Sequence, residues 1–367
     1  PTLLRLGLGV AVLAVVGCST SPADVPPPNK PRHTGLNHSD VLGTNATRWP
    51  EQVVSGQPQG LLFRAHGSEP AHATVLCLHG IQTHAAWFAP LARELTRQGV
   101  NVIAVDRRGS GMNSGPGFLP ADAESVQQLL DDLDLQMREA ARLRAPVYLA
   151  GTSWASNVAA VYSLRRRDAA TQPAGIIQLV PATQSFFESF FRTRVVLPLA
   201  VLFKPQGRKK VPFEPGHYQA GDKQPDAVTG QPPAPRGIDH SKVVLHHEDP
   251  RLTTLLKTDT DNQALVQAPT YRLLHAGLKL GREWSSSAQG KNLQVPMLLI
   301  VADRDQIMNN HKAWLAAERR TRAWPGQLTV KHLPEAGHGA QITAASALAG
   351  HIARWITQEG ARSAARP

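Results

Sequence analysis

Beyond its N-terminal part, the chain alternates short apolar runs with longer amphipathic stretches, and this alternation constrains the fold more than any other feature. The runs Thr74 to Leu78, Val100 to Val105 and Val147 to Ala150 have the length and composition of buried strands. Helical periodicity lies between them, over 87–97 and 122–143. Strands that alternate with helices in this way predict a mostly parallel sheet with helices on both faces, an α/β fold.

The alternation stops for a long stretch and then resumes, which predicts one core with an insertion. We expect the core to comprise 59–182 and 292–360, and residues 183–291 to form a cap or lid, because no simple crossover needs a connection of that length. The first part of the cap, 186–203, is apolar and aromatic, and its last part, 249–284, regains helical character. An apolar lid of this kind is able to cover an acyl chain; the alternative is that these side chains pack the cap onto the core.

The N-terminal residues have the pattern of an export signal followed by a tether. Residues 3–16 are apolar apart from one arginine, too few to span a bilayer as a helix but suited to a signal peptide. The sequence Val15-Val16-Gly17-Cys18 resembles a bacterial lipobox, which predicts acylation of Cys18 after removal of the signal; the alternatives are an ordinary secretory signal or an uncleaved anchor. We expect 1–18 to be the signal and 19–58 a flexible tether to a membrane of the bacterial cell envelope.

Charge and composition exclude some classes of partner. The net charge is +11 with a pI near 10.0, but the basic residues are spread along the chain and only 5% of residues are aromatic, so we expect no nucleic-acid partner. We expect no metal or cofactor, since His246-His247-Glu248-Asp249 lacks a zinc-ligand spacing. Cys77 lies within a predicted strand and Cys18 within the signal, so no disulfide is expected.

A candidate nucleophile lies between a predicted strand and a predicted helix. Gly151-Thr152-Ser153-Trp154-Ala155 follows the strand at Val147 to Ala150 and opens a helix. A sharp turn at this point pushes the Ser153 Oγ away from the sheet and leaves the next backbone N–H, that of Trp154, facing a substrate. A second backbone donor is the Ile81 N–H, which follows a predicted strand; two such donors are able to stabilise a developing oxyanion.

An acid and a histidine follow the serine in the order Ser, Asp, His. Asp303 and Asp305 both come directly after a predicted strand, and His338 follows the last predicted strand between two glycines. A serine hydroxyl needs a histidine to accept its proton, and that histidine needs a carboxylate to fix its tautomer. We expect Ser153 to be the nucleophile and His338 the base, because position singles out His338 among the 15 histidines.

These motifs together resemble the α/β-hydrolase superfamily over about 61–355. Leu78-His79-Gly80-Ile81 is similar to the strand end that supplies an oxyanion donor, and Asp106 to Gly115 is similar to a D-x-R-G-x-G-x-S loop. The serine turn is similar to the nucleophile elbow, except that Ala155 replaces its last glycine. The nearest branch holds monoacylglycerol lipases, lysophospholipases and serine aminopeptidase-like proteins.

The resemblance implies an acid and a function. In this fold the acid follows a small strand-ending residue by three positions, which favours Asp305 over Asp303. The leading hypothesis is a lipid-anchored serine hydrolase of small acyl esters such as monoacylglycerols or lysophospholipids. The alternatives are a peptidase that releases N-terminal residues, and a binding lipoprotein that keeps the fold without catalysis; the presence of Ser153 and His338 beside this acid argues against the latter.

Overall fold

A computed structural model describes the chain over 38–50, 58–67, 70–81, 83–113, 125–166, 171–183, 270–286, 292–305, 308–322 and 327–364, together with the single residues 123, 168 and 199. These residues all belong to one compact unit. Within them, no helix has both the length and the apolar composition needed to cross a membrane. The predicted signal with Cys18, the first part of the tether and most of the predicted cap lie outside the described residues.

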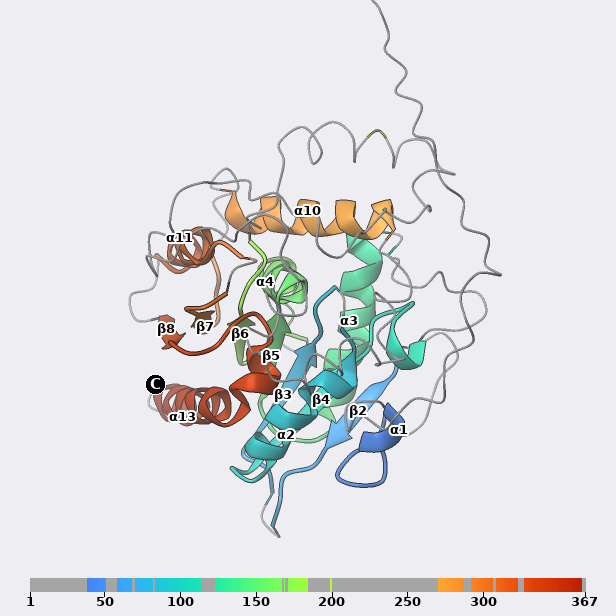
Figure 1. Ribbon diagram of the computed structural model, residues 1–367. Coiled ribbons are helices and arrows are strands. Elements are labelled where there is room, and N and C mark those ends of the chain that lie inside the picture. Colours follow the sequence, from blue (N-terminus) through green and yellow to red (C-terminus); the bar gives the residue numbers. More distant parts are fainter. Residues whose placement is uncertain are drawn as a thin grey trace, which may run out of the picture. The chain divides into compact units, whose positions relative to one another are not determined.

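The described residues form an eight-stranded, mostly parallel sheet in the order β1-β2-β4-β3-β5-β6-β7-β8 (Figure 1). The strands β1 and β2 at one edge are antiparallel to their neighbours, and the remaining six are parallel. This confirms the predicted α/β architecture. The bounds are β1 Thr47–Trp49, β2 Gly60–Phe63, β3 Ala73–Leu78, β4 Val100–Val105, β5 Val147–Thr152, β6 Gly175–Leu179, β7 Met297–Ala302 and β8 Leu328–Leu333.

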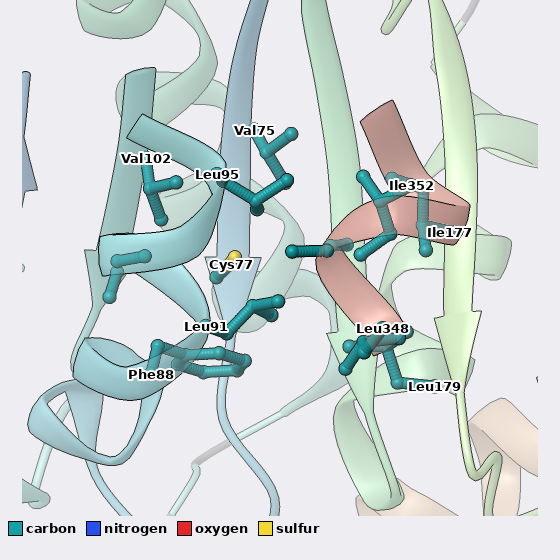
Figure 2. Close-up of a cluster of buried hydrophobic side chains, with 14 of the residues drawn as sticks. Val75, Cys77, Phe88, Leu91, Leu95, Val102, Ile177, Leu179, Leu348 and Ile352 are labelled. Carbon is teal, nitrogen blue, oxygen red and sulfur yellow. The ribbon is translucent and has the colours of Figure 1, made fainter. Parts of the chain in front are cut away.

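Helices cover both faces of the sheet. On one face α2 (Ala89–Thr96) and α13 (Ala345–Ala364) pack over the strands, and Figure 2 shows Leu91 and Leu348 of these two helices against β3 and β6. The other face is covered by α3 (Val126–Ala141), α4 (Trp154–Arg165) and α11 (Asn310–Thr321), and α10 (Tyr271–Ser285) packs on these helices. Shorter elements are α1 (His38–Val41), η2 (Ala85–Phe88), η3 (Gly111–Asn113) and α12 (Ala340–Thr343).

The connections that follow β3 and β5 run in opposite directions along the sheet. From β3 the chain passes through α2 on one face to β4, and from β4 it passes through α3 on the other face to β5. The strands β4 and β5 lie on either side of β3. From β5 the chain continues through α4 to β6, away from β3, so the loops after β3 and β5 diverge. Such a switch point is where open α/β sheets bind their ligands.

The prediction that residues 19–58 form a flexible tether is wrong for the last part of this range. The segment that contains α1 and β1 packs against the core, and β1 pairs with β2. Trp49 is buried, and its indole N–H donates to Gln136 Oε1 of α3 at 3.1 Å. A strand of three residues at an edge of the sheet gives too little periodicity to stand out from a segment that is rich in proline and polar residues.

The predicted boundary of the cap also needs correction, because α10 packs onto the core. Its buried residues face α4, and Gly277 approaches the Trp154 side chain so closely that a Cβ at position 277 would lie 2.1 Å from the indole nitrogen. Helical periodicity predicts an apolar face but does not identify its partner. The residues of the cap that precede α10 lie outside the described residues, apart from residues 183, 199 and 270.

Trp49→Ala tests whether the N-terminal segment is part of the folded unit. We expect the substitution to lower the free energy of unfolding by about 3 kcal/mol, because it removes a buried indole and leaves a cavity beside Gln136. Urea denaturation of the two proteins measures the difference. Arg48→Ala, at the exposed neighbouring position of the same strand, is the control and should change stability by less than about 0.5 kcal/mol. Equal stability of all three proteins would contradict the packing of β1.

Candidate active site

Ser153 sits at a strained turn between β5 and α4. Its backbone angles are φ 52° and ψ −122°, and this positive φ is unusual for a residue with a side chain. The turn brings β5 so close to α4 that a Cβ at Gly151 would lie 2.4 Å from the carbonyl oxygen of Ala155. Glycine is therefore required at position 151, whereas the methyl group of Ala155 is buried in the core without breaking the turn.

The loops after β7 and β8 bring an acid and a histidine to this serine. His338 Nε2 lies 2.9 Å from Ser153 Oγ, and His338 Nδ1 lies 2.8 Å from Asp305 Oδ2. With its proton on Nδ1, the imidazole donates to the carboxylate and accepts from the serine hydroxyl. The three predicted side chains thus form one continuous hydrogen-bonded chain that is able to withdraw a proton from Ser153.

The two aspartates that compete for the acid role have different partners. Asp305 is 3% exposed, and its Oδ1 accepts the backbone N–H of Met308 at 3.1 Å while Oδ2 contacts His338. Asp303 instead lies 2.8 Å from His332 Nδ1 in a partly exposed pair. The structure therefore brings Asp305, and not Asp303, into contact with the histidine that reaches Ser153.

The two predicted backbone donors flank Ser153. Trp154 is the first residue of α4, where N–H groups have no partner within the helix and carry the positive end of its dipole. Ile81 follows Gly80, whose Cα would place a Cβ 3.3 Å from Ser153 Cβ. In the described part of the chain neither the Trp154 nor the Ile81 backbone N–H has an acceptor. Both remain available for a negatively charged oxygen near Ser153.

The loop after β4 has a structural role that its motif alone did not specify. The buried Asp106 accepts backbone N–H groups from Ala85 at 2.7 Å and Met112 at 3.0 Å, and lies 2.7 Å from His38 Nε2. Burial raises the pKa of this carboxyl, but His38 and the surrounding histidines outweigh it and hold the pKa well below its usual range. Gly111 has φ +50° and no room for a side chain beside this carboxylate.

Asn113, rather than a serine, occupies the last position of the D-x-R-G-x-G-x-S pattern. Its side chain exchanges two hydrogen bonds with the backbone of Gln59, at 2.9 and 3.1 Å. These bonds attach the loop to the residue that precedes β2. The adjacent Ser114 lies outside the described residues.

His79 supports the loop that carries Ile81. Its Nδ1 lies 2.7 Å from the Gly80 carbonyl oxygen, and its Nε2 accepts the backbone N–H of Arg107 at 3.2 Å. Both contacts require a neutral ring with the proton on Nδ1. Burial, reinforced by the charge of Arg107, lowers the pKa of His79 to about 3, which keeps the ring neutral.

A small cavity of about 50 Å³ lies beside Trp154, between α3, α4 and the ends of β3 and β4. Most of its wall is apolar, with Leu129, Leu133 and Val158 among the side chains that line it, and Arg107 is one of its polar groups. Within the described residues no group of His, Cys, Asp or Glu is arranged to hold a metal ion. The residues His246 and His247 lie outside the described part of the chain.

Residues 69–342 match the protein family described as serine aminopeptidase, S33, which is well over half of the chain. The chain belongs to this S33 family. Its fold and family identify it as an enzyme of the α/β-hydrolase type. A stretch of 109 residues is 31% identical to an uncharacterized abhydrolase domain-containing protein of Dictyostelium discoideum, but covers only 30% of this chain and 11% of that protein.

Solved structures with the same fold include lipases and an esterase. The S33 chain is similar to a monoglyceride lipase from Saccharomyces cerevisiae with a TM-score of 0.64 and 16% identity, over 84% of this chain and 94% of that one. For a monoacylglycerol lipase from Paleococcus ferrophilus the TM-score is 0.62 and the identity 16%, over 83% of this chain and 99% of that one. For a carboxyl esterase from Bacillus coagulans the TM-score is 0.59 and the identity 14%, over 85% of this chain and 98% of that one. These similarities confirm the α/β-hydrolase fold.

Because His79 is neutral in the folded protein, it makes stability depend on pH, and His79→Asn tests this dependence. The pKa of His79 is 6.5 in the unfolded chain and about 3 in the folded one. Between these two pH values only the unfolded chain binds a proton at His79. The contribution of the neutral ring to the free energy of unfolding is therefore fully present above pH 6.5 and decreases as the pH falls toward 3. The variant lacks this loss. We expect the excess stability of the wild type over the variant to shrink by roughly 1–2 kcal/mol between pH 7.5 and pH 5 in urea titrations. A difference that does not change with pH would show that His79 takes up a proton in the folded protein.

Proposed function

We propose that this protein is a serine hydrolase that cleaves carboxylic esters with Ser153 as nucleophile, His338 as base and Asp305 as acid. The single observation that carries the proposal is the continuous contact from Asp305 Oδ2 through the His338 ring to Ser153 Oγ, at 2.8 and 2.9 Å. The strained backbone of Ser153 supports it, because strain of this kind is maintained where a side chain must be presented in one direction.

The reaction follows from this arrangement. His338 accepts the proton of Ser153 Oγ as the oxygen bonds to the ester carbonyl carbon, and the negatively charged carbonyl oxygen accepts hydrogen bonds from the Ile81 and Trp154 N–H groups. The C–O bond to the alcohol then breaks, and the imidazolium gives its proton to the leaving oxygen. A water molecule, deprotonated by His338, attacks the acyl-enzyme, and the proton returns to Ser153 as the carboxylic acid leaves.

Two observations support an acyl ester with an apolar part. The segment 186–203, expected to belong to the lid, is rich in aromatic and aliphatic residues. Two of the similar structures are described as monoglyceride or monoacylglycerol lipases. Monoacylglycerols and lysophospholipids are therefore the proposed substrates.

The N-terminal sequence supports attachment to a membrane. Acylation of Cys18 in the lipobox-like Val15-Val16-Gly17-Cys18 would provide hydrocarbon chains, each buried CH₂ of which contributes about 0.8 kcal/mol to membrane binding. An anchor of this kind, in the bacterial cell envelope, would hold the hydrolase at the surface where acyl lipids are found. We propose this location on the sequence alone.

Cleavage of N-terminal residues from peptides is the second candidate, and the family description favours it. An aminopeptidase needs a carboxylate that is available to bind the free amino group of its substrate. Around the described part of the site each carboxylate already has a cationic or imidazole partner: Asp305 pairs with His338, Asp303 with His332, Asp106 with His38 and Asp132 with Arg108. This favours ester hydrolysis.

Substitution of Ser153 and Asp305 tests the proposed triad. With p-nitrophenyl butyrate, we expect Ser153→Ala and Asp305→Asn each to reduce kcat by about 10³-fold or more, since the serine supplies the attacking oxygen and the aspartate fixes the imidazole tautomer. Asp303→Asn is the matched control, and its kcat should stay within about twofold of the wild type. A fluorophosphonate probe should label the wild type but not Ser153→Ala. Full activity of Ser153→Ala would refute the assignment of the nucleophile, and absence of labelling of the wild type would favour a non-catalytic protein.

A direct comparison of substrates separates the two reaction classes. We expect kcat/KM for a monoacylglycerol or a lysophosphatidylcholine in mixed micelles to exceed that for an aminoacyl p-nitroanilide by at least about 10²-fold, because no described carboxylate is available for the amino group. Rates on both substrates are measured with the same enzyme and corrected with Ser153→Ala. A ratio that favours the aminoacyl amide would replace the proposed ester hydrolase with an aminopeptidase.

A further inference from the structure

We propose that Arg107 is a positioning residue that holds both backbone donors of the oxyanion site in place. The proposal rests on the proposed function, in which the Ile81 and Trp154 N–H groups bind the oxyanion. Arg107 occupies the unspecified second position of the D-x-R-G-x-G-x-S pattern, so the motif itself assigns it no role.

The guanidinium of Arg107 binds the backbone on both sides of Ile81. Nη1 donates to the Gly80 carbonyl oxygen at 3.1 Å, and Nη2 donates to the Ile81 carbonyl oxygen at 2.7 Å. The two nitrogens are fixed relative to each other by the planar guanidinium, so the two carbonyl groups are fixed as well. A lysine has a single nitrogen and cannot hold both in this way.

Fixing the Gly80 carbonyl also fixes the Ile81 N–H. The two groups belong to one planar trans peptide unit, in which C=O and N–H point in opposite directions. Arg107 and the Nδ1–H of His79, 2.7 Å away, both donate to this carbonyl oxygen. The Ile81 N–H is therefore directed away from Arg107. Since Gly80 packs directly against Ser153, rotation of this peptide unit would move the donor relative to the nucleophile.

The same guanidinium contacts the residue that carries the second donor. Its Cζ lies 5.4 Å from the centroid of the Trp154 ring, within the range of a cation–π interaction. The indole of Trp154 is confined on another side by Gly277 of α10. Arg107 thus links the loop after β3 to the first residue of α4, and the two N–H groups belong to these two elements.

The charge of Arg107 adds to its geometric role. Burial lowers the pKa of Arg107 to about 10, against the opposing effect of Asp106, so the side chain remains a cation at neutral pH. A cation that binds the Gly80 carbonyl polarises the whole peptide unit and makes the Ile81 N–H a stronger donor. Its field also favours negative charge on the substrate oxygen.

Arg107→Met tests the proposal, with Arg108→Met as the matched control on the same loop. Arg108 binds Asp132 with two hydrogen bonds and contacts neither donor in the described structure. Using p-nitrophenyl butyrate and rates normalised to the fraction of sites titrated by a fluorophosphonate, we expect Arg107→Met to lower kcat by about 10- to 100-fold with KM within about twofold. Arg107→Lys should recover part of the loss, because it restores the charge and one contact. Arg108→Met should retain kcat within about twofold.

The outcomes separate this inference from the proposed function. If Ser153→Ala is inactive but Arg107→Met matches Arg108→Met in kcat, the positioning role is wrong and the proposed function stands. If Ser153→Ala keeps full activity, the proposed function itself fails. The pair His79→Asn and Arg107→Met adds a second readout: both act on the Gly80 carbonyl, so the double variant should lose less than the product of the two single effects. Independent effects would contradict a shared action on that peptide unit.

Discussion

Parallel pairing of the central strands is the constraint on which the rest of the site depends. The pairs Leu78 with Gly151, Thr152 with Leu179 and Ala302 with Leu333 place the carboxyl ends of β3, β5, β6, β7 and β8 near one edge of the sheet. The loops that follow β3, β5, β7 and β8 carry the oxyanion donors, the serine, the acid and the histidine. Residues far apart in the chain meet there because the register of the parallel strands aligns their carboxyl ends.

The strain at Ser153 is maintained by bonds on both sides of the turn. Its N–H donates to Leu179 of the neighbouring strand at 2.9 Å, and its carbonyl oxygen accepts the N–H groups of Ser156 and Ala182, each at 3.1 Å. A positive φ of this kind costs about 1–3 kcal/mol, and satisfied backbone groups in a closely packed strand and helix offset that cost. Hydrogen bonds to the sheet and to the first turn of α4 thus fix the backbone conformation of Ser153 and the direction of its side chain.

The sequence was informative where periodicity and turn chemistry agree. The strand before Ser153 and the helix after it were predictable because an apolar run, a glycine and a helical stretch follow one another within a few residues. The preference for Asp305 over Asp303 came from family resemblance, and its physical reason appears only in three dimensions: Asp305 is buried beside His338, while Asp303 faces His332 near the surface.

Contacts between distant segments that no motif marks were not predictable from one sequence. A short strand such as β1 carries almost no periodic signal, and α10 shows an apolar face without showing that α4 covers it. Arg107 gave no signal at all, because its role depends on two carbonyl oxygens from the loop after another strand. A local sequence pattern indicates which side chains of a segment are buried. Which other segment those side chains pack against depends on the whole fold.

The support of the oxyanion loop extends into the N-terminal segment. The carboxylate of Asp106, next to Arg107, is held by backbone groups of Ala85 and Met112 and by His38, which precedes β1. The negative charge of Asp106 favours the charged form of the buried Arg107 guanidinium, because it opposes the lowering of the Arg107 pKa by burial. The last part of the predicted tether therefore acts on the oxyanion loop in steps: His38 contacts Asp106, the charge of Asp106 stabilises that of Arg107, and Arg107 binds the carbonyl groups of Gly80 and Ile81.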